Sequence, residues 1–163
     1  MIYSKFTLIF LILIGASGVS RSIGQTNPCI FCEIANNNKQ ESQVVFRDKV
    51  VVAFMSRGPR NPGHVLVIPR VHAKELVEVS DSTTRQMLSI ARMIALAIRQ
   101  TDIKCEAFRF QINSGEAAGQ TVFHSHLHIM PRYKGDEVNE GKVVSNEELD
   151  VIAKKIRDIL NGK

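Results

Sequence analysis

Short apolar runs separated by turn-forming residues predict a β-sheet in the middle of the chain. Each run is rich in β-branched or aromatic residues, and Gly, Pro and Asp residues stand between the runs. We expect five strands, at residues 44–46, 50–55, 64–68, 108–112 and 123–130. Taken in this order, they predict an antiparallel meander.

Two longer segments show the apolar spacing of amphipathic helices. The first follows the Asp81-Ser-Thr cap region and has its apolar residues on one face: Met87, Ala91, Ile94, Ala95 and Ile98. The second begins with the capping-box pattern Ser145-Asn-Glu-Glu148 and ends at Gly162. We interpret both apolar faces as core or dimer surface. The elements together predict an α+β fold, in which a five-stranded antiparallel sheet packs against one long helix and a C-terminal helix.

The N-terminal segment, residues 1–22, has the pattern of a secretory signal peptide. Lys5 gives a positive start, residues 6–16 are almost wholly apolar, and small residues suited to cleavage follow up to Ser20. The apolar run is shorter than the roughly 20 residues that cross a bilayer, so a permanent membrane helix is disfavoured and an uncleaved anchor is the alternative. The segment predicts a secreted or periplasmic protein, with no membrane contact once the leader is removed.

The rest of the chain has the length and composition of one domain, without repeats or low-complexity stretches. The formal net charge is +5, no basic run is present, and aromatic residues make up 6% of the chain. A nucleic-acid groove requires a concentrated basic surface and aromatic rings for base stacking. The composition therefore favours an anionic small molecule over a nucleic acid as the ligand.

Three histidines at alternate positions, His124, His126 and His128, are the main candidates for chemistry. On a strand this spacing places three imidazoles on one face, where they can serve as nucleophile, general acid or base, or metal ligands. The preceding segment, from Gly115 to Thr121, contains glycines that let backbone N–H groups approach an anion. Together with the polar side chains around it, this segment predicts an oxyanion or phosphate pocket beside a nucleophile.

The chain resembles the histidine triad (HIT) family of nucleotide hydrolases and transferases, whose signature is His-x-His-x-His followed by apolar residues. The resemblance continues in the expected order through Cys29-Ile-Phe-Cys-Glu-Ile34, Val52-Ala-Phe54, Pro62-Gly-His-Val-Leu-Val-Ile-Pro69, Asn113-Ser-Gly and Arg132. It implies a HIT domain over residues 27–163 and a homodimer whose two sheets run together.

The resemblance also implies a mechanism. In the family the central histidine attacks the α-phosphorus of a nucleotide, which assigns His126 as the nucleophile that forms a covalent nucleotidyl-histidine. A backbone carbonyl is expected to fix the tautomer of its ring. The third histidine favours hydrolysis, because related transferases typically have glutamine there, and no divalent metal is required for the chemistry. The residues expected to contact the substrate are His64, Asn113, Gln120, Thr121 and His128.

The pair Cys29-x-x-Cys32 is typical of a zinc half-site, a redox pair or a disulfide. The resemblance suggests a structural zinc site completed by His72 and His124, as in bacterial-type members of the family. The leader argues for a disulfide instead, because oxidising compartments favour disulfides. Both interpretations stay open at this point, while Cys105 is interpreted as a buried apolar residue.

The leaving group and the base also stay open. Ser56 stands where many family members have an acidic or amide side chain that holds the ribose hydroxyls. The loop around Ser56 resembles the branch that splits dinucleoside polyphosphates, whereas the paired cysteines resemble the branch that splits phosphoramidates. Two rival classes are a nucleotide-binding or interaction module with incidental turnover, and a metallohydrolase with all three triad histidines as ligands.

Overall fold

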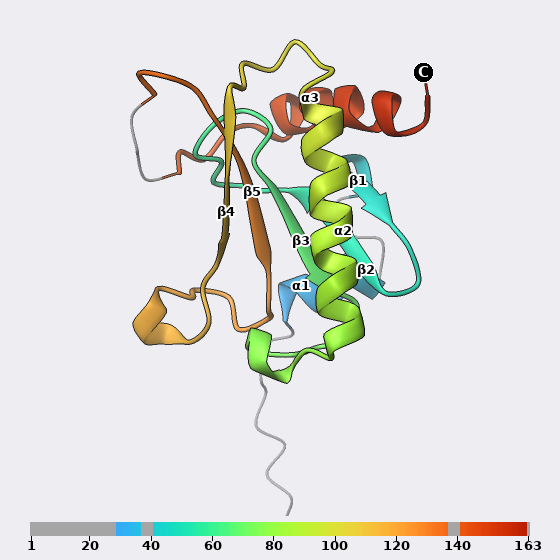
Figure 1. Ribbon diagram of the computed structural model, residues 1–163, viewed down its shortest axis with the longest axis vertical. Coiled ribbons are helices and arrows are strands. Elements are labelled where there is room, and N and C mark those ends of the chain that lie inside the picture. The colour runs from blue at the N-terminus through green and yellow to red at the C-terminus, as the bar shows by residue number, and fades with distance from the viewer. Residues whose placement is uncertain (1–28, 37–40, 137–140, 163) are drawn as a thin grey trace, which may run out of the picture.

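The computed structural model describes residues 29–36, 41–136 and 141–162. Its centre is a five-stranded sheet in which all neighbouring strands are antiparallel. The strands are β1 (Val44–Arg47), β2 (Val51–Met55), β3 (Val65–Pro69), β4 (Ala107–Ile112) and β5 (Leu127–Arg132). Their spatial order is β1-β2-β3-β5-β4 (Figure 1). The α+β fold is confirmed, and the sheet differs from a sequential meander because β5 lies between β3 and β4.

The helices of the described residues include the two that the sequence predicts. The Ser80 hydroxyl accepts a hydrogen bond from the Thr83 N–H, and the Ser145 hydroxyl accepts one from the Glu148 N–H, both at 3.2 Å. These caps satisfy N–H groups that lack a partner inside the helix, so α2 and α3 begin directly after them. The α-helices are α1 (Ile30–Asn36), α2 (Asp81–Ile98) and α3 (Asn146–Leu160), and the short 3-10 helices are η1 (Glu41–Gln43), η2 (Leu76–Glu78) and η3 (Glu116–Ala118).

Alternation of side chains along the strands gives the sheet two different faces. One face packs against α2 and α3 and forms the larger core, which includes Leu127 and Ile129 of β5. Figure 1 shows α2 lying across this face. The opposite face packs against α1 in a smaller cluster that includes Phe31 and Leu66. Because His128 lies between Leu127 and Ile129, its side chain belongs to the α1 face.

The last strand is shorter than the sequence predicts, which changes the interpretation of the three histidines. β5 begins at Leu127, so His124 and His126 precede the strand. The backbone before β5 is bound elsewhere, because the Ser125 N–H donates to the Ala73 carbonyl at 2.7 Å. Pairing with β3 starts only at Leu127. The prediction that all three imidazoles form one row on a strand is therefore wrong.

Candidate active site

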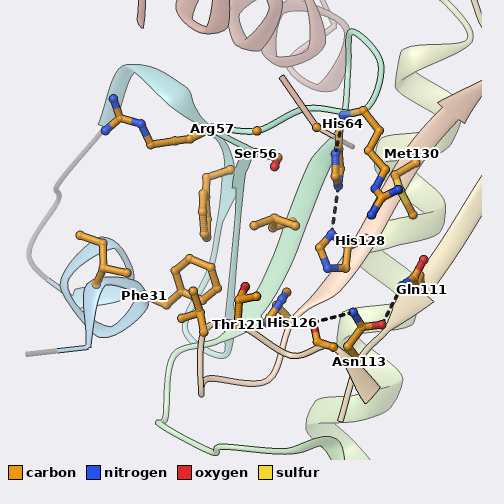
Figure 2. A pocket seen from close by; sticks show the side chains of 18 of the residues that line it. Phe31, Ser56, Arg57, His64, Gln111, Asn113, Thr121, His126, His128 and Met130 are labelled. Carbon is orange, nitrogen blue, oxygen red and sulfur yellow. Dashed lines mark hydrogen bonds between the residues drawn. The ribbon is translucent and has the colours of Figure 1, made fainter. Parts of the chain in front are cut away.

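A cavity of about 570 Å³ opens on the α1 face of the sheet (Figure 2). Phe31 lies toward one end of the cavity (the apolar end), and His64, His128, Gln111 and Asn113 lie toward the other (the polar end), as Figure 2 shows. The apolar side chains of the whole lining are Ile30, Phe31, Ile34, Phe54, Leu66, Val122 and Met130, and its polar side chains include Arg60, His64, Gln111, Asn113, His126 and His128. The described residues that line the cavity include no Asp or Glu. This arrangement suits a ligand with an apolar ring and an anionic group.

His126 lies between the two ends of the cavity (Figure 2). Its ring stands edge-on to Phe31, with centroids 5.3 Å apart, and its centroid is 4.8 Å from that of His128. The Nδ1–H of His126 donates to the carbonyl of His124 at 2.7 Å, which leaves the lone pair on Nε2. Burial lowers the pKa of His126, so the ring is neutral near neutral pH. A neutral imidazole with an available Nε2 can act as a nucleophile or as a base.

A chain of hydrogen bonds fixes the tautomers of His64 and His128. The backbone N–H of Arg60 donates to His64 Nδ1 at 3.2 Å, so the proton of the neutral His64 ring is on Nε2. His64 Nε2 lies 3.0 Å from His128 Nδ1 and therefore donates to it (Figure 2). The remaining proton of His128 is consequently on its Nε2. This leaves a hydrogen-bond donor on a ring that lines the cavity.

Both rings are held in the neutral form. Burial, followed by the charges of His128 and Arg60, lowers the pKa of His64 to about 3. Burial, followed by the charges of His126 and Arg60, lowers the pKa of His128 to about 4. Near neutral pH the pair therefore offers directed hydrogen bonds without a positive charge of its own.

Gln111 and Asn113 place two amides at the polar end of the cavity. They are two residues apart at the end of β4, so both side chains lie on the same side of the backbone. The Gln111 Nε2–H donates to Asn113 Oδ1 at 2.7 Å, and the Asn113 Nδ2–H donates to the Gly119 carbonyl at 3.2 Å. Gln111 is paired with His128 across β4 and β5. Thr121 also lines the cavity, nearer to its apolar end in Figure 2.

Gln120 does not line the cavity, contrary to the sequence prediction. Its side chain is buried, and its Oε1 accepts a hydrogen bond from the Gly115 N–H at 2.7 Å. Its Nε2 donates to the carbonyls of Lys74 at 2.6 Å and Val122 at 2.9 Å. Both donor hydrogens and the oxygen are thus used within the loop. Gln120 therefore holds the loop that carries Asn113 and Thr121, and its amide is not directed at a ligand.

A second constellation lies next to the cavity. Four potential ligand atoms, from Cys29, Cys32, His72 and His124, all lie within 4.8 Å of one another. His124 Nδ1 is 3.5 Å from each sulfur and 3.3 Å from His72 Nδ1, and His72 Nδ1 is 3.2 Å from the Cys32 sulfur. Tetrahedral zinc with ordinary bond lengths implies about 3.3 Å between two nitrogens and about 3.6 Å between nitrogen and sulfur. The cluster can therefore hold a metal ion.

The protonation of this cluster also suits a metal. The Nε2–H of His124 donates to the carbonyl of Pro69 at 2.8 Å, so its Nδ1 presents a lone pair to the two sulfurs. Burial and the neighbouring Cys29 raise the pKa of the Cys32 thiol to about 11, so a cation is required to hold both sulfurs as thiolates near neutral pH. Both cysteines are free thiols in the structure.

The three triad histidines do not converge on one point. His124 points to the cysteines, while the Nδ1 atoms of His126 and His128 are engaged by the His124 carbonyl and by His64. In the described residues the candidate metal cluster includes only His124 of the triad. The alternative of a metallohydrolase with all three as ligands therefore has no support in the geometry.

Sequence reasoning missed three parts of the cavity. Gln111 could have been found from its spacing to Asn113 on a predicted strand. Phe31 belongs to α1, a helix of 7 residues that is too short for a clear periodic signal. Arg60 lies in a loop, where no periodicity indicates the direction of a side chain. Gly63, with φ of +83°, completes that loop, and a Cβ there would lie 3.2 Å from Pro131 Cγ.

Comparison with known proteins assigns the family. The family model for the HIT domain matches residues 37–135 of the chain. The protein belongs to the histidine triad (HIT) family. An uncharacterized HIT-like protein of Methanocaldococcus jannaschii is 35% identical over 130 residues, which cover 79% of this chain and 98% of that protein. The adenylylsulfatase HINT3 of Arabidopsis thaliana is 32% identical over 124 residues, which cover 75% of this chain and 62% of that protein.

Solved HIT structures have the same fold. A zinc-bound histidine triad family protein from Mycobacterium smegmatis superposes with a TM-score of 0.71 at 28% identity. The superposition covers 83% of this chain and 98% of that chain. The HIT fold expected from the triad and its flanking motifs is thus confirmed.

The expectation of a secreted or periplasmic protein is wrong. The predicted leader, residues 1–22, lies outside the described residues. The Methanocaldococcus relative is matched over 98% of its length by 130 residues of this chain, which leaves no room in that HIT protein for a leader. In the described part of the chain, no helix is both long and apolar enough to span a membrane. The argument for a disulfide between Cys29 and Cys32 rested on an oxidising compartment, so it lapses with the expectation of secretion.

Proposed function

We propose that this HIT protein is a nucleotide hydrolase that cleaves the bond between a nucleoside 5′-monophosphate and its leaving group. The observation that carries the proposal is the hydrogen bond from His126 Nδ1–H to the His124 carbonyl, which presents Nε2 as a nucleophile in the cavity. The adenylylsulfatase among its relatives supports a nucleotide as the substrate.

The two ends of the cavity suggest how a nucleotide binds. Phe31 and Leu66 line the cavity and can pack against a purine or pyrimidine ring. Ser56 is buried at 8% exposure and can make one hydrogen bond to a ribose hydroxyl. The amide of Asn113 and the Nε2–H of His128 lie at the polar end and can donate to phosphoryl oxygens.

The reaction would have two steps. His126 Nε2 forms a bond to the α-phosphorus while the bond from that phosphorus to the leaving group breaks, and the leaving group keeps the electron pair. Water then attacks the phosphorus, and the electron pair of the broken P–N bond returns to Nε2. The products are the nucleoside monophosphate, the leaving group and a proton. His128 and Asn113 would stabilise the charge on the phosphoryl oxygens in both steps.

The test is turnover by His126→Ala. Loss of the nucleophile should lower kcat by several orders of magnitude, as deletion of covalent nucleophiles does, while binding of nucleoside monophosphate is affected far less. Ser89→Ala, a substitution on the exposed side of α2, is the control for activity lost through handling or misfolding. Near-normal turnover by His126→Ala would overturn the proposal. Nucleotide binding without turnover by the wild-type protein would support the binding-module alternative.

We further propose that Cys29, Cys32, His72 and His124 hold a structural zinc ion. The ligand spacing and the tautomer of His124 support this, as does the zinc-bound Mycobacterium relative. A bound ion would cross-link the start of α1 to the segment before β5. Protein atoms would occupy all four of its coordination positions. No open position would remain for substrate, so its part in turnover would be indirect.

A homodimer through β4 is the proposed assembly. β4 is an edge strand, and its six residues include Phe108, Phe110 and Ile112. Phe110 is 47% exposed, and an edge strand with apolar residues favours pairing with another strand. A second copy paired antiparallel at β4 would join two sheets. Light scattering of the wild type and of Phe110→Lys tests this, and a monomeric wild type at micromolar concentration would contradict it.

A further inference from the structure

Arg60 is an unusual feature of the polar end of the cavity. It lines the cavity together with His64 and His128, and its positive charge contributes to the lowered pKa of both rings. Arg57 also lines the cavity, and its guanidinium donates to Asn146 Oδ1 at 3.0 Å, at the start of α3. Arg60 is thus a cation of the cavity lining whose charge acts on both histidines.

The backbone around Arg60 is firmly held. The Ser56 N–H donates to the His64 carbonyl at 2.9 Å, and the Arg60 N–H donates to His64 Nδ1. Asn61 Nδ2 donates to the Pro131 carbonyl at 2.8 Å and to Asp136 Oδ2 at 2.7 Å. A loop with these contacts keeps the Cα of Arg60 in place, so its side chain starts from a defined point beside His128.

We propose that Arg60 is a specificity-determining residue, which selects substrates whose leaving group is a tetrahedral oxyanion, either phosphate or sulfate, over substrates with an amine leaving group. The inference rests on the proposed hydrolysis at His126 and adds the chemical class of the leaving group. A guanidinium can bind two oxygens of such a group at once, with charge-assisted hydrogen bonds. The Nε2–H of His128 lies at the same end and can donate to the oxygen at which the bond breaks.

The protonation of the site favours the same leaving groups. When the bond from the α-phosphorus to a phosphate or sulfate oxygen breaks, the electron pair stays on an oxygen that is stable as an anion, and no proton is needed. An amine leaving group must take up a proton as the P–N bond breaks. The pKa of His128 is lowered to about 4, so this ring is a poor proton source near neutral pH. A nitrogen that is protonated before the bond breaks would carry a positive charge, which Arg60 would repel.

The kinetic experiment compares leaving groups on one nucleoside. Adenosine 5′-phosphosulfate and diadenosine tetraphosphate have oxyanion leaving groups, and adenosine 5′-phosphoramidate has an amine. Arg60→Gln should lower kcat/KM for the first two by about ten-fold or more, as expected for lost charged hydrogen bonds, and change the third by less than about three-fold. Arg92→Gln, on the exposed side of α2, makes the same change in net charge and should alter none of them.

Equal losses on all three substrates would overturn the proposal, since Arg60 would then act on the site in general. Arg60→Lys should recover only part of the loss, because a lysine cannot form the two-pronged contact. If only the phosphosulfate or only the tetraphosphate responds to Arg60→Gln, that response identifies which oxyanion the subsite takes.

A binding experiment separates this inference from the proposed hydrolysis. AMP and α,β-methylene-ADP share the nucleoside and the α-phosphate, and the second adds an oxyanion that cannot be cleaved off. Calorimetry should show tighter binding of α,β-methylene-ADP to the wild type, by about ten-fold, and no preference in Arg60→Gln. The same preference in both proteins would refute the subsite. If the wild type shows the preference but no turnover, the subsite stands and the hydrolase proposal fails.

Discussion

His64 Nε2 and His128 Nδ1 lie 3.0 Å apart, and the two rings are tilted by 44°. The direction of this hydrogen bond is set from outside the pair, because the backbone N–H of Arg60 occupies the other nitrogen of His64. A backbone N–H cannot act as an acceptor, so the proton positions along the chain cannot be reversed while the rings are neutral. His64 is therefore a positioning residue that acts through His128.

The first prediction concerns replacement of His64. In His64→Gln the amide Nε2–H can take over the hydrogen bond to His128, whereas in His64→Leu that donor is lost and the tautomer of His128 is free. We expect His64→Leu to lower kcat by about ten-fold or more with little change in KM, because proton placement contributes mainly in the transition state. Turnover by His64→Gln should lie closer to wild type. Equal effects of both variants would point to packing instead.

The second prediction concerns stability in acid. His64 has its pKa lowered from 6.5 to about 3, so between these values an unfolded chain binds more protons at this site than the folded one. The free energy of unfolding should accordingly fall as the pH drops below 6.5 and be unaffected above it. The slope from one such group is at most about 1.4 kcal/mol per pH unit.

Urea unfolding at several pH values checks this prediction. His64→Gln removes one of the groups, so its stability should depend less steeply on pH than that of the wild type, although His128 still contributes. Identical slopes for the two proteins would show that His64 is protonated in the folded state. The comparison is made between variants with equal metal content, because acid also protonates metal ligands.

The third prediction concerns the metal cluster. Cys32→Ser removes a ligand and should lower both the zinc content, from one ion per chain, and the melting temperature. Turnover per folded molecule should fall less, because the proposed ion binds no substrate. Cys105→Ser is the matched control, since Cys105 lies outside the cluster and its sulfur contacts the Ala107 carbonyl at 3.2 Å. A fully stable Cys32→Ser protein without metal would contradict the assignment.

The fourth prediction separates two amides of the same loop. Gln120→Ala leaves buried partners without hydrogen bonds and should lower the free energy of unfolding by about 1–3 kcal/mol. Asn113→Ala should change stability little but lower kcat/KM by about one to two orders of magnitude, because it removes a donor to the phosphoryl group. Urea unfolding and steady-state kinetics of both variants distinguish the roles. If Gln120→Ala lowers kcat/KM and Asn113→Ala lowers the free energy of unfolding instead, Gln120 is the residue that contacts the substrate.

The sequence predicts those parts of the fold in which hydrophobic periodicity and capping agree. The helix from Asp81 to Ile98 has both a clear apolar face and a Ser cap, and the structure reproduces it closely. Periodicity fails before β5, where His124 and His126 keep the spacing of a strand without being in one. Their backbone geometry is set by the bond of Ser125 to Ala73, a residue far away in the sequence, which local patterns do not reveal.

The candidate site, like the fold, could be predicted from the sequence only in part. Residue type and motif were enough to indicate that His126 and His128 share a pocket, which the structure places at 4.8 Å between ring centroids. The same information could not decide whether Gln120 faces a ligand or its own loop, because an amide can do either. Arg60 belongs to a loop whose course depends on Asn61 and Asp136, so its position could be known only from the folded chain.

The alternation along β5 limits how this protein can diverge over evolutionary time. Leu127 and Ile129 face the core while His128 faces the cavity, so an insertion or deletion of one residue within the strand would exchange the two faces and damage both at once. Ser56, Arg57, Gly58 and Arg60 also line the cavity but lie in a loop outside the sheet, so their side chains are not tied to an alternation between two faces. New substrate preferences in descendants of this sequence should therefore arise in that loop, on an unchanged strand.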